Sequence, residues 1–306
     1  MLLLMLLYVF SIIKFGIISI YVTNLIRSLS ILYLSIMMHF ISKRPNLNKV
    51  KAMWTVVTGC TDGIGRAFVE ELAKSRGIRK FYLISRNPEK LSQLKKHLEE
   101  TYSADVCTVV FDFGKDDLKL LPNELSTIEV GILYGLAIIV LVNCVGTGPP
   151  NITPFVDNPK GMASEILRVN LMSTVKMIEL VMPGMVKRDT GYIINVASMA
   201  GWRPMPFLSS YSASKAAISF LSNTLAQEYK KTNVYVQCFV PLLVATKIIG
   251  AKEQKPTVFM VSPQQFARDA VRLIGVTKVA TGCLKHDIEV IYYNVDLKSV
   301  SRNIRT

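Results

Sequence analysis

Cysteine and histidine, the residues that build disulfide frameworks and zinc sites, are few in this chain. Its 306 residues contain five cysteines and three histidines, and the cysteines are widely spaced without a C-x-x-C pair. We therefore expect neither a disulfide framework nor a metal site. Half of the residues are hydrophobic and only 19% are charged, which excludes a disordered or fibrous protein.

Acidic residues are missing from the first 61 positions, which carry six lysine and arginine side chains. The rest of the formal net charge of +14 is spread over a much longer stretch. It forms no dense basic run interleaved with aromatic residues, the pattern that is typical of nucleic-acid binding. We therefore expect no nucleic-acid partner.

Residues 1–42 form a nearly continuous apolar stretch that only Lys14 and Arg27 interrupt. No uninterrupted run reaches the ~20 residues that a spanning helix needs. A span must therefore include one cation, whose insertion cost of ~2.5–3.5 kcal/mol the many leucines and isoleucines outweigh. A cleaved signal peptide would begin with basic residues, and a core helix would not be apolar all round. We predict a membrane anchor, as either one tilted span or a hairpin.

A basic linker over residues 43–52 follows the anchor and holds four of the six N-terminal cations. Basic flanks of this kind stay on the cytosolic side of a membrane, although a solvated linker would have the same composition. The rest of the chain then faces the cytosol. This orientation agrees with unpaired cysteines, and it predicts that the Asn151-Ile-Thr153 sequon is not glycosylated.

From Met53 to residue 306, short β-rich runs alternate with helical patterns. Such alternation is typical of successive β-α-β units that build a parallel sheet. We expect one α/β domain with a doubly wound parallel sheet over residues 53–306, preceded by the anchor. The expected strands cover residues 54–57, 80–84, 106–111, 192–196 and 234–240, and the expected helices cover residues 163–182 and 211–230 and begin again at Ser262-Pro263.

A glycine-rich turn follows the first expected strand, with the sequence T-G-C-T-D-G-I-G from Thr58 to Gly65. Glycines permit a tight turn and close approach of the backbone, and the free N–H groups and positive dipole of the next helix bind a pyrophosphate. The alternative is that these glycines serve only the turn. The candidate cofactor-binding residues are Gly59, Thr61, Asp62, Gly63, Ile64 and Gly65.

A cation occupies the position that distinguishes the two nicotinamide cofactors. The second strand ends at Ser85-Arg86, about twenty residues after Gly65, where an NAD-binding unit places an acidic residue for the ribose 2′-hydroxyl. Arg86 suits a 2′-phosphate instead, so we predict NADP(H). The alternative is an ordinary exposed arginine before the helix that starts at Asn87-Pro88.

A tyrosine and a lysine lie one helical turn apart, at Tyr211 and Lys215. Residues i and i+4 share one face of a helix. A cation beside a phenol favours phenolate and lowers the tyrosine pKa from ~10 toward the working pH of a general acid or base. Tyrosine and lysine also take this spacing by chance, but Ser198 at the end of a strand and Asn170 within the preceding helix strengthen the functional interpretation.

The T-G-x-x-x-G-I-G turn, Asn170, Ser198 and the Y-x-x-x-K motif together resemble the short-chain dehydrogenase/reductase family, from about residue 53 to 275. That resemblance implies a Rossmann fold. Shorter segments, such as Leu83–Arg86 and Met182–Met185, are similar to a membrane-bound subgroup of this family. The subgroup contains 17β-hydroxysteroid dehydrogenases and very-long-chain 3-oxoacyl-CoA reductases of the endoplasmic reticulum. Location in that membrane, with the catalytic domain facing the cytosol, is what the resemblance implies.

The resemblance implies a role for each catalytic residue. Tyr211 would protonate the carbonyl oxygen as NADPH delivers hydride to carbon, and Ser198 would hydrogen-bond that oxygen. Lys215 would bind the nicotinamide ribose and lower the tyrosine pKa. Asn170 would hold a water that links Lys215 to solvent.

Further cofactor contacts follow from the same resemblance. Asp112 would meet the adenine, Thr246 would touch the nicotinamide end, and Asn143 would begin an Asn-Asn-x-Gly turn on the adenine side. Plainer alternatives exist: a turn cap for Ser198, a helix-kinking polar residue for Asn170 and a strand-end turn for Asp112.

The sequence departs from the family pattern around the fourth strand. The second asparagine of the turn is Cys144, and residues 130–142 contain no charge, whereas a strand usually has ~5–6 residues. We interpret residues 134–140 as an insertion, which would force the strand to shift register or to bulge. The segment after Gly282 is also shorter than the hydrophobic tail of the subgroup.

We therefore expect a membrane-anchored, NADPH-dependent reductase of a lipid ketone, with roles in fatty acid elongation or steroid metabolism. Very-long-chain 3-oxoacyl-CoA is preferred over a 17-ketosteroid, because an anchored domain suits a substrate whose tail lies in lipid. The expected partners are this lipid-like substrate, the membrane, and either a second copy or a fatty-acid elongation complex. A catalytically impaired dinucleotide-binding scaffold is the alternative, and a serine hydrolase is rejected because Ser198 lacks the flanking glycines of a nucleophile elbow.

Overall fold

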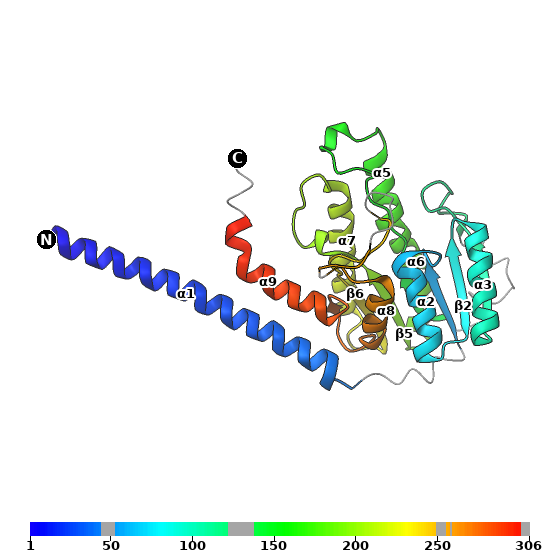
Figure 1. Cartoon of the computed structure of the whole chain (residues 1–306). Helices are drawn as coiled ribbons and strands as arrows, with labels where there is room; N and C mark the ends of the chain where they lie inside the picture. Colours follow the sequence, from blue (N-terminus) through cyan, green and yellow to red (C-terminus); the bar gives the residue numbers. More distant parts are fainter. Residues whose placement is uncertain (44–52, 122–137, 249–254, 258, 301–306) are drawn as a thin grey trace. The chain divides into compact units, whose positions relative to one another are not determined.

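The computed structural model describes residues 1–43, 53–121, 138–248, 255–257 and 259–300 (Figure 1). The chain divides into two compact units. One unit is Lys43–Cys283, and the other combines Met1–Ser42 with Leu284–Thr306.

The larger unit contains a seven-stranded sheet in which every pair of neighbouring strands is parallel. The strand order is β3-β2-β1-β4-β5-β6-β7, which reverses direction between β1 and β4. This arrangement confirms the predicted doubly wound Rossmann fold. The strands are β1 (Trp54–Thr58), β2 (Lys80–Ser85), β3 (Asp105–Val110), β4 (Ile138–Asn143), β5 (Gly191–Val196), β6 (Val234–Phe239) and β7 (Val279–Ala280).

Helices connect the strands and mostly follow the expected ranges. The helix expected over residues 163–182 is longer and is divided by a π-helical turn, η4 (Arg168–Met172), which contains Asn170. Three further short 3-10 or π segments are η1 (Met37–Ile41), η3 (Phe155–Asp157) and η5 (Met199–Gly201). The helices of this unit are α2 (Gly63–Arg76), α3 (Pro88–Tyr102), α5 (Met162–Leu167), α6 (Ser173–Lys187), α7 (Ser209–Glu228) and α8 (Pro263–Arg272).

Helices cover both faces of the sheet. Side chains of successive strand residues point to opposite faces, so each strand contributes to both layers of the core. Val234 and Val236 of β6 belong to a core cluster that also holds Met177 and Met182 of α6. Phe239 instead meets Phe68 of α2 and Phe266 of α8, with ring centroids 6.1 and 6.4 Å away. A sheet buried on both sides explains why its strands read as continuous hydrophobic runs.

Strand β4 contains part of the segment that we interpret as an insertion. Residues 138–140 lie in the sheet, whereas residues 134–137 fall outside the described residues. Trp54 of β1 pairs with Ile138, but Thr55 pairs with Val140, so the register shifts there. Such an irregularity accommodates one surplus residue, Ile139, within the ladder.

The smaller unit consists of α1 (Leu2–Ile36) with η1, and α9 (Leu284–Val300). Helix α1 is continuous, so the hairpin alternative does not hold within residues 2–36. Asp287 of α9 accepts hydrogen bonds from Ser35 Oγ at 2.6 Å and lies 3.1 Å from His39 Nε2. Helix α9 groups with α1, so the larger compact unit ends at Cys283.

Two helical stretches among the described residues are long and apolar enough to cross a membrane, residues 3–41 and 162–187. The apolar window of the first is 0% buried, which makes it a candidate membrane anchor. The second contains α6, whose Met177, Val181 and Met185 are buried in the sheet core. It is therefore a core helix.

Candidate active site

The carboxyl ends of β1 and β4 bring two predicted turns together at the point where the strand order reverses. Thr58 Oγ1, at the end of β1, accepts hydrogen bonds from the N–H groups of Cys144 and Val145 at 3.2 and 3.4 Å. Ligands of open α/β sheets bind in the crevice at such a reversal. The glycine-rich turn and the Asn143-Cys144 turn therefore border one site.

Two glycines shape the first turn because a side chain would collide with backbone. Gly59 has φ +64°, and a Cβ there would lie 2.9 Å from the Cys144 carbonyl oxygen. A Cβ on Gly65 would lie 2.2 Å from the Gly59 carbonyl oxygen. Asp62 caps α2 by accepting a hydrogen bond from Gly63 N–H at 2.9 Å. The first turn of α2, which includes Ile64, thus presents N–H groups that the helix itself leaves unpaired.

Predicted residues for the adenosine end gather beside this turn. Thr61 Oγ1 lies 2.7 Å from Ser85 Oγ, which joins the turn to the end of β2. Arg86 follows directly and is exposed. Lys90 Nζ of α3 donates to Asp62 Oδ2 at 2.8 Å. Burial alone would raise the pKa of Asp62, but the hydrogen bond from Lys90 lowers it below its ordinary value.

Lys90 is a cation that the sequence interpretation missed. It lies in the first turn of α3, where its N–H donates to the Asn87 side chain at 2.7 Å. The signal was available, since the Asn87-Pro88 helix start places position 90 next to the end of β2. Arg86 and Lys90 place two cations at this corner, and the Asp62 carboxylate offsets the charge of Lys90.

The side chains of Asp112 and Asn143 form hydrogen bonds with other groups of the protein. Asp112 Oδ1 accepts a hydrogen bond from Gly114 N–H at 2.9 Å, which is the turn that was its plainer alternative. Asn143 Nδ2 donates to Asn195 Oδ1 on β5 at 2.8 Å, and Asn195 donates onward to Ser222 Oγ at 2.9 Å. Both residues lie at strand ends and have protein partners, but the buried Asn143 Oδ1 accepts no hydrogen bond within the described residues.

Helix α7 presents Tyr211 and Lys215 on one face, and both are buried. Lys215 Nζ lies 5.8 Å from the centroid of the Tyr211 ring and donates to the Val196 carbonyl oxygen at 2.9 Å. Ser198, two residues after β5 ends, accepts a hydrogen bond from Ala200 N–H at 3.2 Å and is also hydrogen-bonded to Tyr211. The three predicted catalytic side chains therefore meet.

The protonation of Tyr211 differs from the expectation. Burial raises the pKa of Tyr211 above its ordinary value, and the hydrogen bond with Ser198 opposes that rise only partly. The expected net lowering of the tyrosine pKa is therefore wrong for this structure. The lysine ammonium points to the Val196 carbonyl, and the desolvation of a phenolate outweighs it. The phenol keeps its proton at neutral pH.

Asn170 contacts the same centre through its side chain. Its Nδ2 donates to Thr147 O at 3.0 Å and to Ser214 Oγ at 2.9 Å, and its Oδ1 accepts from Thr147 N–H at 2.8 Å. Thr147 and Ser214 are two further site residues that the sequence interpretation missed. Asn170 thus joins the loop after β4 to α7, one residue before Lys215.

Thr246 and Cys144 complete the crevice. A Cβ on Gly63 would lie 3.2 Å from Thr246 Cγ2, so Thr246 borders the first turn of α2. Burial raises the pKa of the Cys144 thiol to about 12, and the charge of Lys215 opposes this rise. Cys144 is therefore a neutral thiol close to the catalytic lysine.

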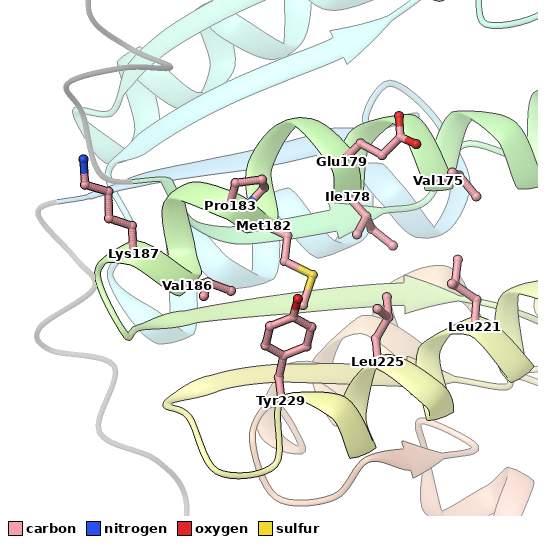
Figure 2. Close-up of a pocket in the computed structure, with 10 residues that line it drawn as sticks. All are labelled: Val175, Ile178, Glu179, Met182, Pro183, Val186, Lys187, Leu221, Leu225 and Tyr229. Atoms are coloured by element: carbon pink, nitrogen blue, oxygen red, sulfur yellow. The ribbon is translucent and has the colours of Figure 1, made fainter.

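A separate hollow of about 580 Å³ lies between α6 and α7 and contains neither Tyr211 nor Lys215 (Figure 2). Apolar side chains from both helices form most of its wall, among them Met182 and Leu225. Glu179 and Lys187 lie at its border. Since the catalytic residues lie elsewhere on α7, this hollow is not the reaction site.

Comparisons with known sequences agree with this geometry. The sequence profile of the family described as short chain dehydrogenase matches residues 53–257. The chain is 40% identical over 237 residues to the very-long-chain 3-oxoacyl-CoA reductase of Mus musculus, covering 77% of this chain and 72% of that protein. The human protein of the same name is 39% identical over 235 residues, with 76% and 72% covered. The uncharacterized oxidoreductase dhs-27 of Caenorhabditis elegans is 47% identical over 190 residues, but this chain spans only 22% of it.

Solved structures share the fold at lower identity. A 7β-hydroxysteroid dehydrogenase has a TM-score of 0.67 and 21% identity, with 81% of this chain and 94% of that chain covered. A short-chain dehydrogenase from Sphingobium yanoikuyae in complex with NADPH has a TM-score of 0.65 and 22% identity, with 83% and 97% covered. The family profile, the relatives and the assembled Tyr211, Lys215 and Ser198 lead to one identification. This chain belongs to the short-chain dehydrogenase family.

Proposed function

We propose that this protein is a membrane-anchored, NADPH-dependent reductase of a lipid ketone, with very-long-chain 3-oxoacyl-CoA as the favoured substrate class. One observation carries the proposal. A buried, protonated Tyr211 is hydrogen-bonded to Ser198 and lies beside Lys215, next to a turn that only glycines can form. Carbonyl reduction needs a proton donor next to the crevice that binds the dinucleotide cofactor, and Tyr211 is placed as such a donor.

Each catalytic residue has its own role at the carbonyl group. NADPH, when bound, would supply a hydride to the carbonyl carbon. Tyr211 donates its phenolic proton to the carbonyl oxygen, and Ser198 stabilises that oxygen by a hydrogen bond. The ammonium of Lys215 stabilises the phenolate that remains, and it would hydrogen-bond the nicotinamide ribose of a bound cofactor. Asn170 holds the loop at Thr147 against Ser214 of α7, one residue before Lys215.

The residues around the glycine-rich turn of Thr58 to Gly65 fit NADP(H). The N-terminus of α2 and the close approach allowed at Gly59 and Gly65 suit the pyrophosphate, and Thr246 borders the same turn. Arg86 and Lys90 would hold the 2′-phosphate, and the 22%-identical dehydrogenase noted above was solved with NADPH. Asp112 and Asn143 stay predicted contacts on the adenine side.

Arg86→Asp is expected to weaken the preference for NADPH over NADH by roughly 10- to 100-fold, since a charge-assisted hydrogen bond contributes about 1.5–3 kcal/mol. Steady-state kcat/KM with each cofactor measures the ratio. Lys96→Asp, on the exposed part of α3, is the matched control and should leave the ratio unchanged. An unaltered ratio in Arg86→Asp would refute the assignment.

The substrate class is tested by offering both candidates to the full chain in membranes. NADPH oxidation is followed with a very-long-chain 3-oxoacyl-CoA and with a 17-ketosteroid. The relatives named above favour the acyl-CoA, and an anchored enzyme suits a substrate whose chain lies in lipid. Turnover of the steroid alone would replace the proposed substrate. A second copy of the chain or other elongation proteins stay predicted partners.

The pKa of Lys215 predicts the pH above which the reaction slows. Burial lowers the pKa of its ammonium to about 8. A lysine is charged below its pKa, so the positive charge beside Tyr211 is present at pH 7 and is lost as the pH rises through about 8. We expect kcat/KM for ketone reduction, measured at saturating NADPH, to fall on that alkaline side. A profile that stays flat to about pH 10 would contradict this role.

The membrane orientation has a natural reporter, because Asn151 of the sequon is exposed. If the larger unit faces the cytosol, endoglycosidase treatment leaves the electrophoretic mobility unchanged. A sequon in an N-terminal extension is the positive control, since that end would lie in the lumen. A mobility shift that Thr153→Ala removes would place the unit on the lumenal side and overturn the proposed orientation. Residence in the endoplasmic reticulum is part of the same proposal.

A catalytically impaired scaffold is the second candidate, favoured by Cys144 and by the register shift in β4. It predicts NADPH binding without turnover on either ketone. The intact hydrogen bond between Ser198 and Tyr211 favours the enzyme.

A further inference from the structure

Large apolar side chains are exposed on two loops that lead to the catalytic helices. We name them the apolar rim, and each is between 46% and 86% exposed. The first loop follows β4 and the second follows β5. The apolar rim consists of Ile152, Phe155, Val156, Trp202, Met205 and Phe207.

The two loops flank the catalytic tyrosine. Both leave the carboxyl edge of the sheet and project from the same end of the unit, ahead of α5 and α7 (Figure 1). Ile166 of α5 packs with Ala200, Leu208 and Tyr211, which binds the bases of the two loops together. Whatever covers the rim therefore lies at the entrance to the reaction site.

The rim faces outward and does not line a closed pocket. Val156 is 86% exposed and Phe155 is 60% exposed, whereas side chains that line a substrate cleft would be shielded by the opposite wall. Phe207 has φ +67°, a conformation that a bulky residue rarely adopts. The backbone thus holds an aromatic ring in solvent at a strained position, which is typical of a functional surface.

The chemistry of the rim matches a lipid surface. Tryptophan and phenylalanine with neighbouring cations are the side chains that bind the interface of anionic membranes. Lys160 and Arg203 lie on the same two loops with one acid, Asp157, and the whole chain carries +14. Exposed apolar side chains that gather on the loops next to a reaction site indicate an interaction surface.

We propose that the apolar rim inserts into the surface of the bilayer that anchors α1, so that the long chain of the substrate passes from lipid to Tyr211 without crossing water. This rests on the proposed membrane anchoring, but it adds a second membrane contact with its own residues. A protein partner on the rim would be the competing outcome, and it would leave these side chains out of lipid.

Tryptophan fluorescence tests the proposal directly, because the chain has two tryptophans. Trp54 is 4% exposed and Trp202 is 46% exposed. The full-length Trp54→Phe variant, which keeps Trp202, is reconstituted into phosphatidylcholine and phosphatidylserine vesicles with and without bromine near the top of the acyl chains. We expect bromine to remove roughly half of the Trp202 emission, since interfacial side chains reach ~5–10 Å into the bilayer. The Trp202→Phe variant, which keeps Trp54, should lose none.

Each outcome decides the proposal. Vesicle flotation with selective quenching of Trp202 supports it, and Phe155→Ser should then reduce the quenching while Phe220→Ser, at an exposed site of α7, should not. Flotation without quenching overturns the rim contact and leaves the proposed anchoring intact. Failure to float overturns both. If Trp54→Phe does not fold, the difference between the native chain and Trp202→Phe gives the same signal.

Discussion

Replacing Tyr211 with phenylalanine is expected to lower kcat for ketone reduction by ~10²–10⁴-fold, the usual contribution of a positioned general acid. The change removes one hydroxyl and keeps the ring, which is 6% exposed and packs with Ile166, Ala200 and Leu208. The fold and the cofactor-binding turn should therefore be unchanged in this variant. NADPH oxidation measures the loss, and NADPH fluorescence measures binding, which should be nearly unchanged.

Tyr229→Phe is the matched control for Tyr211→Phe. Tyr229 directly follows α7 but borders the hollow between α6 and α7, away from the reacting centre. Its substitution should leave kcat and NADPH binding unchanged. Substantial ketone turnover by Tyr211→Phe would defeat the proposed proton donor, whereas loss of NADPH binding would indicate that the tyrosine holds the site together.

The sequence predicted the fold where local pattern and burial agree. The strands β1, β2 and β5 are short apolar runs that end at turn residues, and the structure has them within one or two residues of the expected bounds. The spacing of Tyr211 and Lys215 predicted that they share one face of a helix, and the family resemblance added Ser198 to the same site. The strands and the shared helix face depend only on local pattern and helix periodicity.

Other features depend on contacts that a sequence pattern does not contain. The π turn at Asn170 accompanies long-range contacts, because the Asn170 side chain joins Thr147 to Ser214. The direction of the Tyr211 pKa shift was predicted wrongly, because proximity to Lys215 was inferred but the depth of burial was not. The pairing of α9 with α1 joins the two ends of the chain, and no local pattern indicates it.

The register shift in β4 illustrates the same limit. A surplus of apolar residues was evident from the sequence, and two accommodations were predicted, a shift or a bulge. The structure places residues 138–140 in the sheet with one irregularity opposite Trp54 and Thr55. Because regular pairing resumes at Val140, the strand still delivers Asn143 and Cys144 to the crevice. A local defect at the start of a strand therefore leaves its functional end in place.

Gly65→Ala is expected to have the second large effect, on NADPH binding. The new Cβ would lie 2.2 Å from the Gly59 carbonyl oxygen and 2.9 Å from its carbon, so backbone and not a flexible side chain must move. Overpacking of this kind costs about 1–3 kcal/mol, and here the turn that must open is the one that approaches the pyrophosphate. We expect NADPH affinity to fall roughly tenfold or more, as measured by fluorescence titration.

Gly184→Ala separates this effect from a general cost of replacing glycine. The three heavy atoms nearest to a Cβ at position 184 belong to the guanidinium of Arg188, at 3.2 to 3.7 Å, so the far end of a side chain and not backbone would have to adjust. Within α6 the change should be neutral or slightly stabilising, because alanine favours a helix by about 0.5–1 kcal/mol over glycine. Thermal unfolding of both variants then distinguishes a damaged cofactor-binding turn from a destabilised protein. Native NADPH affinity in Gly65→Ala would mean that the turn relaxes without cost and that the close approach of its backbone is not what binds the cofactor.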